Sequence, residues 1–406
     1  MTHASSPQAA PRGLALVAGL ALLLLAACGA ETKTGSNGTG RTPDGPDPTV
    51  ASGPLNGLGP LEVGGASLQE SGTSVLVNST FRSGTADLRL GMTANANGTA
   101  SIASGAGVAA GAVAQSIVQA PVTMLDAGAQ TLALLGLSFQ TDQNTLFEGV
   151  ESLAQIVIGD EVEAFGMTRP GSRLFQATRI IVRRPATGRV ELLGTLDTLA
   201  GTAAQVQGVS VNLANAQVSS TSPTGISSAT PAGISALSTG TLARISGTLN
   251  AATGTLIASS VISSLSPARV EGDVVFLEGF VREVPAQGRF RIADLEVDAA
   301  GVTLFAGSVN IGTRIKVRGK MRGGVMRAEA AEIILPAAQI EYALEGQISD
   351  YSTISSFTVR GERIDASQAA FGNGAASNLG AGRTVRIKGR SANGKLLARE
   401  VVFLGG

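Results

Sequence analysis

Residues 314–322 have the sequence RIKVRGKMR, in which apolar and basic residues alternate around a glycine at position 319. A period of two places successive side chains on opposite faces of a β-strand. Ile315 and Val317 would then face a core, and the cations would face outward. Similar alternating runs that close on glycine occur at five places along the chain. The closing residues are Gly91, Gly166, Gly247, Gly319 and Gly389.

A second element, seven residues long and centred on glycine or aspartate, precedes each of these runs. Its copies are Val63–Gln69, Leu134–Gln140, Val206–Asn212, Ile292–Asp298 and Val359–Asp365. A third element, Ala-x-x-Ile or Ala-x-x-Val, follows each run. Short strands separated by glycine-containing turns favour small closed barrels, which have no exposed sheet edges. We therefore predict an all-β chain with a tandem array of five OB-like β-barrel repeats, each of about 70–80 residues.

The spacing of these elements also predicts the domain boundaries. The expected repeats are residues 55–120, 121–186, 187–266, 267–337 and 338–406. A signal peptide at 1–27 and a flexible linker at 28–54 would precede them, because the linker has almost no large apolar residue to bury. Two stretches rich in small residues, 93–113 and 219–240, are predicted to be mobile surface loops.

The N-terminus predicts a lipid anchor. Residues 14–25 are apolar but form too short a run for a bilayer-spanning helix. They end in Leu25-Ala26-Ala27-Cys28, a pattern typical of a bacterial lipobox. We expect cleavage before Cys28 and acylation of its thiol and new amino group with fatty chains such as palmitate, which would anchor the protein stably in the membrane. The alternatives are an ordinary signal peptide and an uncleaved anchor. Gly29, next to the cysteine, favours the outer membrane of the bacterial cell envelope, on either its periplasmic or its surface side.

The recurring elements resemble a family of repeated small β-barrel domains of unknown function found in bacterial envelope and secreted proteins. The resemblance covers about residues 55–404, and its clearest marks are Leu277–Val281 and Leu344–Ile348, which open the fourth and fifth repeats alike. It implies a small β-barrel fold. The family supplies no activity, so the resemblance implies no catalytic residue.

The composition excludes several kinds of catalytic site. The chain has one His, at position 3, one Cys, at position 28, and no Trp. Ser-His-Asp and Cys-His catalysis, Cys/His zinc sites and disulfides within the chain are thereby excluded. Glu161 and Glu163 are carboxylates on one strand face, and solvation is the favoured interpretation for them. The acids Asp294, Glu296 and Asp298 alternate along a strand and lack the spacing of a Ca²⁺ loop. We therefore expect no enzymatic activity, no cofactor and no metal.

The alternating cations form two candidate anion-binding stripes, one in each of the last two repeats. Their residues are Lys316, Arg318, Lys320, Arg386, Lys388 and Arg390. One interpretation is a surface for an anionic glycan, lipid headgroups or nucleic acid. The other is a solvated face paired with acids across the sheet, for which Asp294, Glu296 and Asp298 are candidates. Thirty basic and thirty acidic residues give a formal net charge of zero. That balance, with no aromatic residue in the stripes, argues against nucleic acid.

Together these features predict a non-enzymatic, lipid-anchored envelope protein that presents its repeats as a scaffold or interaction module. Its expected partners are the membrane, through the N-terminal lipid, and an unidentified envelope protein. The alternative function is a binding module for an anionic polymer or ligand, with the two basic stripes as the binding surface.

Overall fold

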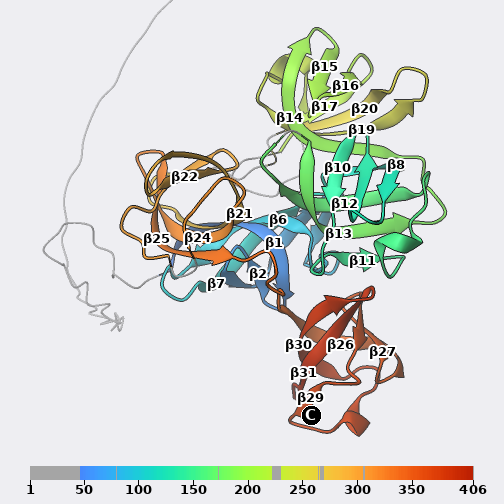
Figure 1. Ribbon diagram of the computed structural model, residues 1–406, viewed down its shortest axis with the longest axis vertical. Coiled ribbons are helices and arrows are strands. Elements are labelled where there is room, and N and C mark those ends of the chain that lie inside the picture. The colour runs from blue at the N-terminus through green and yellow to red at the C-terminus, as the bar shows by residue number, and fades with distance from the viewer. Residues whose placement is uncertain are drawn as a thin grey trace, which may run out of the picture. The chain divides into compact units, whose positions relative to one another are not determined.

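The computed structural model describes residues 46–406, apart from residues 79, 172, 222–229, 264, 266–268, 305–306 and 406. Residues 46–406 belong to one compact unit. In the described residues, β-strands are joined by turns and by three short 3-10 helices, η1 (Leu153–Gln155), η2 (Ile234–Ala236) and η3 (Ala376–Asn378) (Figure 1). The predicted all-β class is confirmed. Leu25, Ala26, Ala27 and Cys28 lie outside the described residues.

The first strands of the chain form two barrels. Barrel 1 contains β1 (Asp47–Leu58), β2 (Leu61–Val63), β3 (Ala66–Gln69), β4 (Ser74–Val77), β5 (Thr80–Ser83), β6 (Thr93–Ala100) and β7 (Ala106–Ala114). Barrel 2 contains β8 (Val118–Asp126), β9 (Thr131–Leu134), β10 (Leu137–Gln140), β11 (Leu146–Glu148), β12 (Glu161–Thr168) and β13 (Leu174–Arg183).

The remaining strands follow the same arrangement. Barrel 3 contains β14 (Val190–Ala200), β15 (Ala203–Val206), β16 (Val209–Asn212), β17 (Gln217–Ser220), β18 (Thr230–Ala232), β19 (Leu242–Asn250) and β20 (Thr255–Ser263). Barrel 4 contains β21 (Val274–Ala286), β22 (Arg289–Ile292), β23 (Leu295–Asp298), β24 (Arg314–Arg322) and β25 (Val325–Ile334). Barrel 5 contains β26 (Tyr342–Thr353), β27 (Ser356–Val359), β28 (Glu362–Asp365), β29 (Ala370–Gly372), β30 (Thr384–Ala392) and β31 (Lys395–Phe403).

Barrel 4 shows how each sheet closes on itself. Strand β21 pairs with β22 and β24, β22 with β23, and β25 with both β23 and β24. Only the β23–β25 pairing in this cycle is parallel. The same cycle runs through β1–β2–β3–β7–β6, β8–β9–β10–β13–β12, β14–β15–β16–β20–β19 and β26–β27–β28–β31–β30. The prediction of small closed β-barrels is therefore confirmed.

The seven-residue elements form tight hairpins between the second and third strand of each cycle. In barrel 2, Leu135 and Gly136 join β9 to β10, with φ angles of 50° and 71°. Positive φ at both turn residues matches the right-handed twist of the flanking strands, and glycine adopts it without a steric penalty. The turn glycine in this element thus fixes the hairpin register.

The closing glycine of each alternating run lies at a β-bulge. Register shifts occur at Gly166, Gly247, Gly319 and Gly389, where an added Cβ would collide with a carbonyl of the adjacent strand. In barrel 1 this place belongs to Gly98, opposite the Val108 carbonyl, and not to Gly91. Gly91 instead approaches the Thr178 carbonyl in barrel 2. The assignment of Gly91 as a closing glycine is therefore wrong.

Two segments predicted to be irregular are strands. Residues 93–113 form β6 and most of β7, and β1 begins at Asp47, inside the stretch assigned to a flexible linker. Alanine side chains fill the core here, and Ala94, Ala96 and Ala109 are buried. A pattern search that relies on large apolar residues misses such strands, because burial and pairing override their low β-propensity. In the 219–240 stretch, β18 and η2 are ordered elements, and residues 222–229 lie outside the described residues.

The opening strands of the cycles also join one barrel to another. Strand β1 pairs in parallel with β21, for example Val50 with Val275, and with β26, Gly57 with Ala343. Strand β8 pairs antiparallel with β14 through Val118 and Leu192. Backbone hydrogen bonds therefore continue from barrel 1 into barrels 4 and 5, and from barrel 2 into barrel 3.

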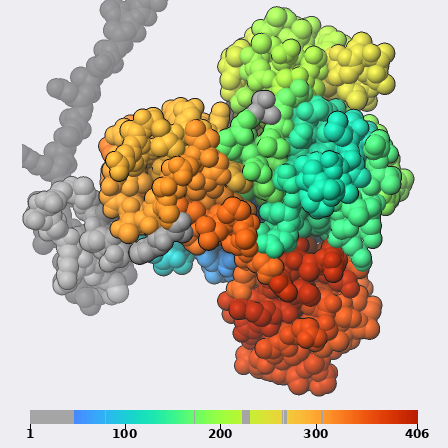
Figure 2. All heavy atoms as spheres, viewed as in Figure 1, coloured from blue at the N-terminus to red at the C-terminus, as the bar shows by residue number. Residues whose placement is uncertain are grey.

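Barrels 2 and 5 also meet through side chains, and Figure 2 shows their atoms in direct contact. The Tyr342 hydroxyl donates to the Asn144 carbonyl at 2.7 Å, and Asn144 Nδ2 donates to the Ala338 carbonyl at 2.9 Å. Burial raises the pKa of Tyr342, which keeps its hydroxyl protonated for this bond.

Candidate functional site

The predicted stripe of barrel 4 lies on the outer face of β24, and the core holds the intervening residues Ile315, Val317 and Met321. Each of its cations has a partner. Arg314 Nη2 lies 2.5 Å and Lys316 Nζ lies 3.9 Å from the Glu278 carboxylate. Lys320 Nζ lies 2.8 Å from Asp47, Arg322 Nη1 lies 3.7 Å from Glu271, and Arg318 Nη1 donates to the Ala103 carbonyl at 2.7 Å. Neighbouring strands thus neutralise much of this stripe.

The acids that the sequence offered as partners pair with other cations. Asp294 lies 3.4 Å from Arg269, Glu296 lies 3.3 Å from Arg289, and Asp298 forms ion pairs with Arg289 and Arg327. The strand order explains this result, because β21 and β25 flank β24, whereas β23 pairs with β22 and β25. A shared period of two could not reveal which strands are neighbours.

The stripe of barrel 5 lies on β30 and is less neutralised. Arg386 Nη2 lies 2.8 Å from Glu345, and both side chains are partly exposed. Arg390 Nη1 donates to Gln339 Oε1 at 2.8 Å. Within the described residues, Lys388 forms no ion pair. The two stripes belong to separate barrels, and Lys316 and Lys388 both act electrostatically on Glu62 of barrel 1.

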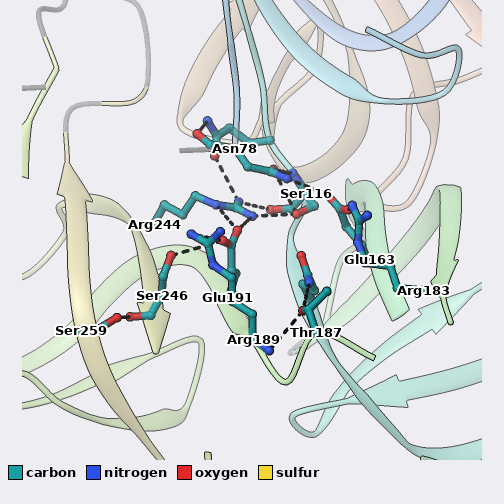
Figure 3. A network of polar contacts seen from close by, with 12 residues as sticks. Asn78, Ser116, Glu163, Arg183, Thr187, Arg189, Glu191, Arg244, Ser246 and Ser259 are labelled. Carbon is teal, nitrogen blue, oxygen red and sulfur yellow. Dashed lines mark hydrogen bonds and ion pairs between the residues drawn. The ribbon is translucent and has the colours of Figure 1, made fainter. Parts of the chain in front are cut away.

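A polar network that the sequence analysis missed lies where barrels 1, 2 and 3 meet (Figure 3). Its centre is Arg244 of β19, whose side chain is fully buried. Nε donates to Glu191 at 2.7 Å, Nη1 to the Ser116 carbonyl at 2.9 Å and to Gln115 Oε1 at 3.1 Å, and Nη2 to Ser116 Oγ at 2.9 Å. Burial lowers the pKa of Arg244 and the Glu191 carboxylate opposes the shift. Arg244 thereby holds barrel 3 to the segment that links barrels 1 and 2.

Glu163 of β12 forms the second part of this network. Its carboxylate is buried in barrel 2 and accepts a hydrogen bond from Asn78 Nδ2 of barrel 1 at 2.6 Å. The same carboxylate forms an ion pair with Arg183. Asn78 has φ 54°, and its Oδ1 accepts from the Ser116 amide at 2.9 Å. Asn78 tolerates this backbone conformation better than most residues. The Asn78 side chain therefore bridges Ser116, in the segment between barrels 1 and 2, and Glu163 of barrel 2.

Glu161, on the same strand as Glu163, is held in a different way. It accepts hydrogen bonds from Gln119 Nε2 at 2.7 Å, Thr187 Oγ1 at 2.6 Å, and the amides of Thr187 and Gly188, each at 2.8 Å. Burial acts to raise the pKa of Glu161, but these hydrogen bonds hold it below its ordinary value. The expectation of a solvated Glu161/Glu163 face is wrong, since both carboxylates are buried and paired.

A cavity of about 550 Å³ opens beside this network. Its ionisable lining is Arg82, Arg89, Arg183, Arg189, Asp87, Glu148, Glu163 and Glu191. Arg82, Arg183 and Arg189 pair with Asp87, Glu163 and Glu191, so three of the four acids are engaged by arginines of the same lining. The described lining contains no Cys, His or Ser nucleophile. Four arginines and four acids thus balance the formal charge of this lining.

Arg179, a buried arginine outside this network, joins barrels 1, 2 and 5. Arg179 Nη1 of β13 donates to Glu362 Oε1 at 3.0 Å and to the Leu90 carbonyl at 2.9 Å, and the Leu90 amide donates to Glu362 Oε1 at 3.0 Å. Burial lowers the pKa of Arg179, but Glu362 and Glu148 outweigh it and the net shift is upward. No clear signal for this contact existed in the sequence, because Arg179 stands beside Gln176 and Thr178 in a strand of mixed composition.

Neither a metal cluster nor a membrane-spanning helix is found in the described ranges. No three His, Cys, Asp or Glu side chains there are placed to hold a metal ion. No helix of that part of the chain has the length and apolar character needed to cross a bilayer.

The comparisons with known proteins point to a domain of unassigned function. A solved structure titled drosophila Unr CSD456 matches at 12% identity over 71% of this chain and 97% of its own, with a TM-score of 0.13 that supports no inference. No curated protein matches. Two regions match a family model, one in barrel 2 and one in barrel 5. Residues 119–181 and 345–402 each carry a domain of unknown function, DUF5666.

Proposed function

We propose that this chain is a lipid-anchored protein of the bacterial cell envelope, outer membrane in preference, and acts as a non-enzymatic scaffold. The observation that carries the proposal is how the barrels are joined. Arg179 and Arg244 are buried charges, and each also has hydrogen-bond partners in another barrel or in the segment between two barrels. Such pairs stabilise little in themselves but impose one specific arrangement of their surroundings. A fixed arrangement of barrels offers a partner one constant surface.

The same proposal includes the finer features of the chain. The barrels would be five copies of one OB-like repeat, since all share one cycle of strand pairings. Cys28, preceded by Leu25-Ala26-Ala27, would carry the lipid. The tether between Cys28 and β1 would be shorter than the predicted linker, because β1 begins at Asp47.

Metabolic labelling with a palmitate analogue tests the anchor. The full chain should incorporate the label and fractionate with the outer membrane, and Cys28→Ser should lose both properties. Label in Cys28→Ser, or unlabelled wild-type protein, would refute the lipid anchor. The scaffold role is tested by crosslinking in cells, in which the wild-type chain should capture a defined envelope protein. Arg244→Gln should reduce that capture while the protein stays folded and membrane-bound.

The second candidate function is binding of an anionic polymer by the stripe of barrel 5. The observation that favours it is that Lys388 forms no ion pair in the described residues and that the Arg386 side chain is half exposed. The test replaces Arg386, Lys388 and Arg390 with Gln and measures retention on heparin, as a model polyanion, against salt concentration. A matched control replaces Arg363, Arg383 and Arg399, three cations of the same barrel. Loss of retention only in the stripe variant would support this function, and equal retention in both would remove it.

A further inference from the structure

Each of the five barrels contains the same four-residue turn, which ends directly before β6, β12, β19, β24 or β30. The turns are residues 89–92, 157–160, 238–241, 310–313 and 380–383. In each turn the amide of the fourth residue donates to the carbonyl of the first, and the third residue is a glycine with φ between 76° and 92°. The glycine amide also donates to the opening strand of its own barrel, as Gly159 does to the Val122 carbonyl at 2.9 Å. The second residue of the turn therefore has an equivalent place in every barrel.

In barrel 1 this second residue, Leu90, docks on two other barrels. Its side chain is completely buried. Its amide donates to Glu362 of barrel 5 at 3.0 Å, and its carbonyl accepts from Arg179 of barrel 2 at 2.9 Å. An added Cβ on Gly91 would lie 2.6 Å from the Thr178 carbonyl, so the backbone of the turn approaches barrel 2 closely. The turn thus presents three groups to other barrels: an aliphatic side chain, an amide donor and a carbonyl acceptor.

In barrel 2 the equivalent residue, Ile158, presents the same three groups to solvent. Ile158 is 68% exposed, and Val157 before it is 59% exposed. In the described residues, neither the amide nor the carbonyl of Ile158 takes part in a hydrogen bond. Ile311 of barrel 4 is also exposed, but an asparagine precedes it, and the equivalent residues Thr239 and Ala381 are small. Ile158 therefore has the largest aliphatic surface of the exposed turns.

Barrel 5 contains a surface built like the one that receives Leu90 in barrel 2. Glu400 takes the place of Arg179, because each comes two positions after the alanine that pairs with the bulge glycine, Ala398 in barrel 5 and Ala177 in barrel 2. The neighbouring strand is also equivalent, since β11 pairs in parallel with β13 at Arg179, and β29 pairs in parallel with β31 at Glu400.

This surface of barrel 5 offers both polar groups that a docking turn needs. Lys388 of β30 lies directly opposite Glu400 of β31, and both are partly exposed. Neither side chain has a hydrogen bond or ion pair within the described residues. Glu400 can accept from a turn amide, as Glu362 does from Leu90. Lys388 can donate to the turn carbonyl, as Arg179 does.

We propose that the Ile158 turn docks on the Lys388/Glu400 surface of barrel 5 in a second copy of this chain. The Ile158 amide donates to the Glu400 carboxylate, and its carbonyl accepts from the Lys388 ammonium. The aliphatic side chains of the turn pack beside β29, where Ala370, the neighbour of Glu400, is exposed. The proposal rests on neither the scaffold role nor the anion-binding role proposed above.

Photocrosslinking of the full chain in cells tests this contact. The variant Ile158→p-benzoyl-phenylalanine should form an adduct of two copies on irradiation. Mass spectrometry should locate the crosslink in β29, β30 or β31 of the second copy. The matched control Thr239→p-benzoyl-phenylalanine has the photoreactive group at the same exposed place in the turn of barrel 3 and should form no such adduct.

Sedimentation of the purified full chain in detergent measures the strength of the association. Ile158→Asp should weaken it by at least about tenfold, because the aliphatic side chain is no longer buried in the contact. Glu400→Ala should weaken it as well, whereas Thr239→Asp should associate as the wild type does. All three positions are at least partly exposed, and circular dichroism confirms that each variant is folded.

Four results would overturn the proposal. The first is no adduct of two copies from position 158. The second is equal adducts from positions 158 and 239, which would indicate unspecific encounters. The third is a crosslink from position 158 to a barrel other than barrel 5. The fourth is an adduct from position 158 with a different protein only, which would assign the turn to another partner.

Discussion

Arg179 of barrel 2 and Glu362 of barrel 5 form a buried ion pair although 183 residues separate them in the sequence. Their side chains are 2% and 8% exposed. Between them lies the backbone of Leu90, which accepts from the arginine and donates to the glutamate. Three barrels therefore share one charged contact, and removal of either partner leaves an uncompensated charge in the interior.

The first prediction concerns this pair. Arg179→Met should lower the free energy of unfolding by about 3–5 kcal/mol, because Glu362 would remain buried without its counter-charge. The double variant Arg179→Met/Glu362→Leu should recover much of that loss. Urea denaturation followed by circular dichroism measures both. Arg82→Met, in the exposed pair with Asp87, is the control and should change stability by about 0–1 kcal/mol. Equal losses in Arg179→Met and Arg82→Met would contradict the structural role of the buried pair.

The second prediction concerns the bulge glycines. Gly319→Ala should destabilise the protein by about 1–3 kcal/mol, since the new methyl group would press on the Arg327 carbonyl and force the strands apart. Gly301, in the same barrel, has open space around it. Gly301→Ala should therefore leave the thermal midpoint close to that of the wild type. A small effect at position 319 would mean that the bulge can relax without loss.

The third prediction concerns Glu161 and pH. Its folded-state pKa lies below the unfolded one, so its ionised form stabilises the fold. This stabilisation is complete above the ordinary glutamate pKa of about 4.3 and disappears as the pH falls through the lower folded-state value. Glu161→Gln should be less stable than the wild type at pH 7, and the difference should shrink in acid. Denaturation midpoints from pH 7 to pH 3 provide the measurement, and a difference that does not depend on pH would contradict it.

The fourth prediction has the opposite sign. Burial raises the pKa of Glu62 in the folded state, so its ionised form destabilises the fold above that value. Lys388 and Lys316 reduce this effect, and Glu341 increases it. Glu62→Gln should therefore raise the thermal midpoint at pH 7. The gain should vanish below the ordinary glutamate pKa, where both side chains are neutral. A lower midpoint for the variant at pH 7 would show that the cations dominate.

The local parts of the fold were predictable because their signals are local. Positive-φ turns such as Leu135–Gly136 and the alternation of β24 each depend on neighbouring residues. Strands β6 and β7 were not predicted, since alanine and glycine carry little hydrophobic pattern even when they fill a core. The junctions could not be predicted either. The partners of Arg179 and Arg244 lie far away in sequence, and only the strand order brings them together.

The strands that pair with β1 impose an order on the folding of this protein. Strand β1, which precedes the other strands of the described residues, pairs with β21 and β26, which are synthesised far later. Pairing between distant segments is slow because a long loop must close first. Barrel 1 can close through its own strands β2 and β6, yet part of its opening strand stays unmatched until the last barrel arrives. During that interval the exposed segment is open to pairing with another chain. The pairing edge of β1 is therefore covered in full only when β26 of the C-terminal barrel has joined it.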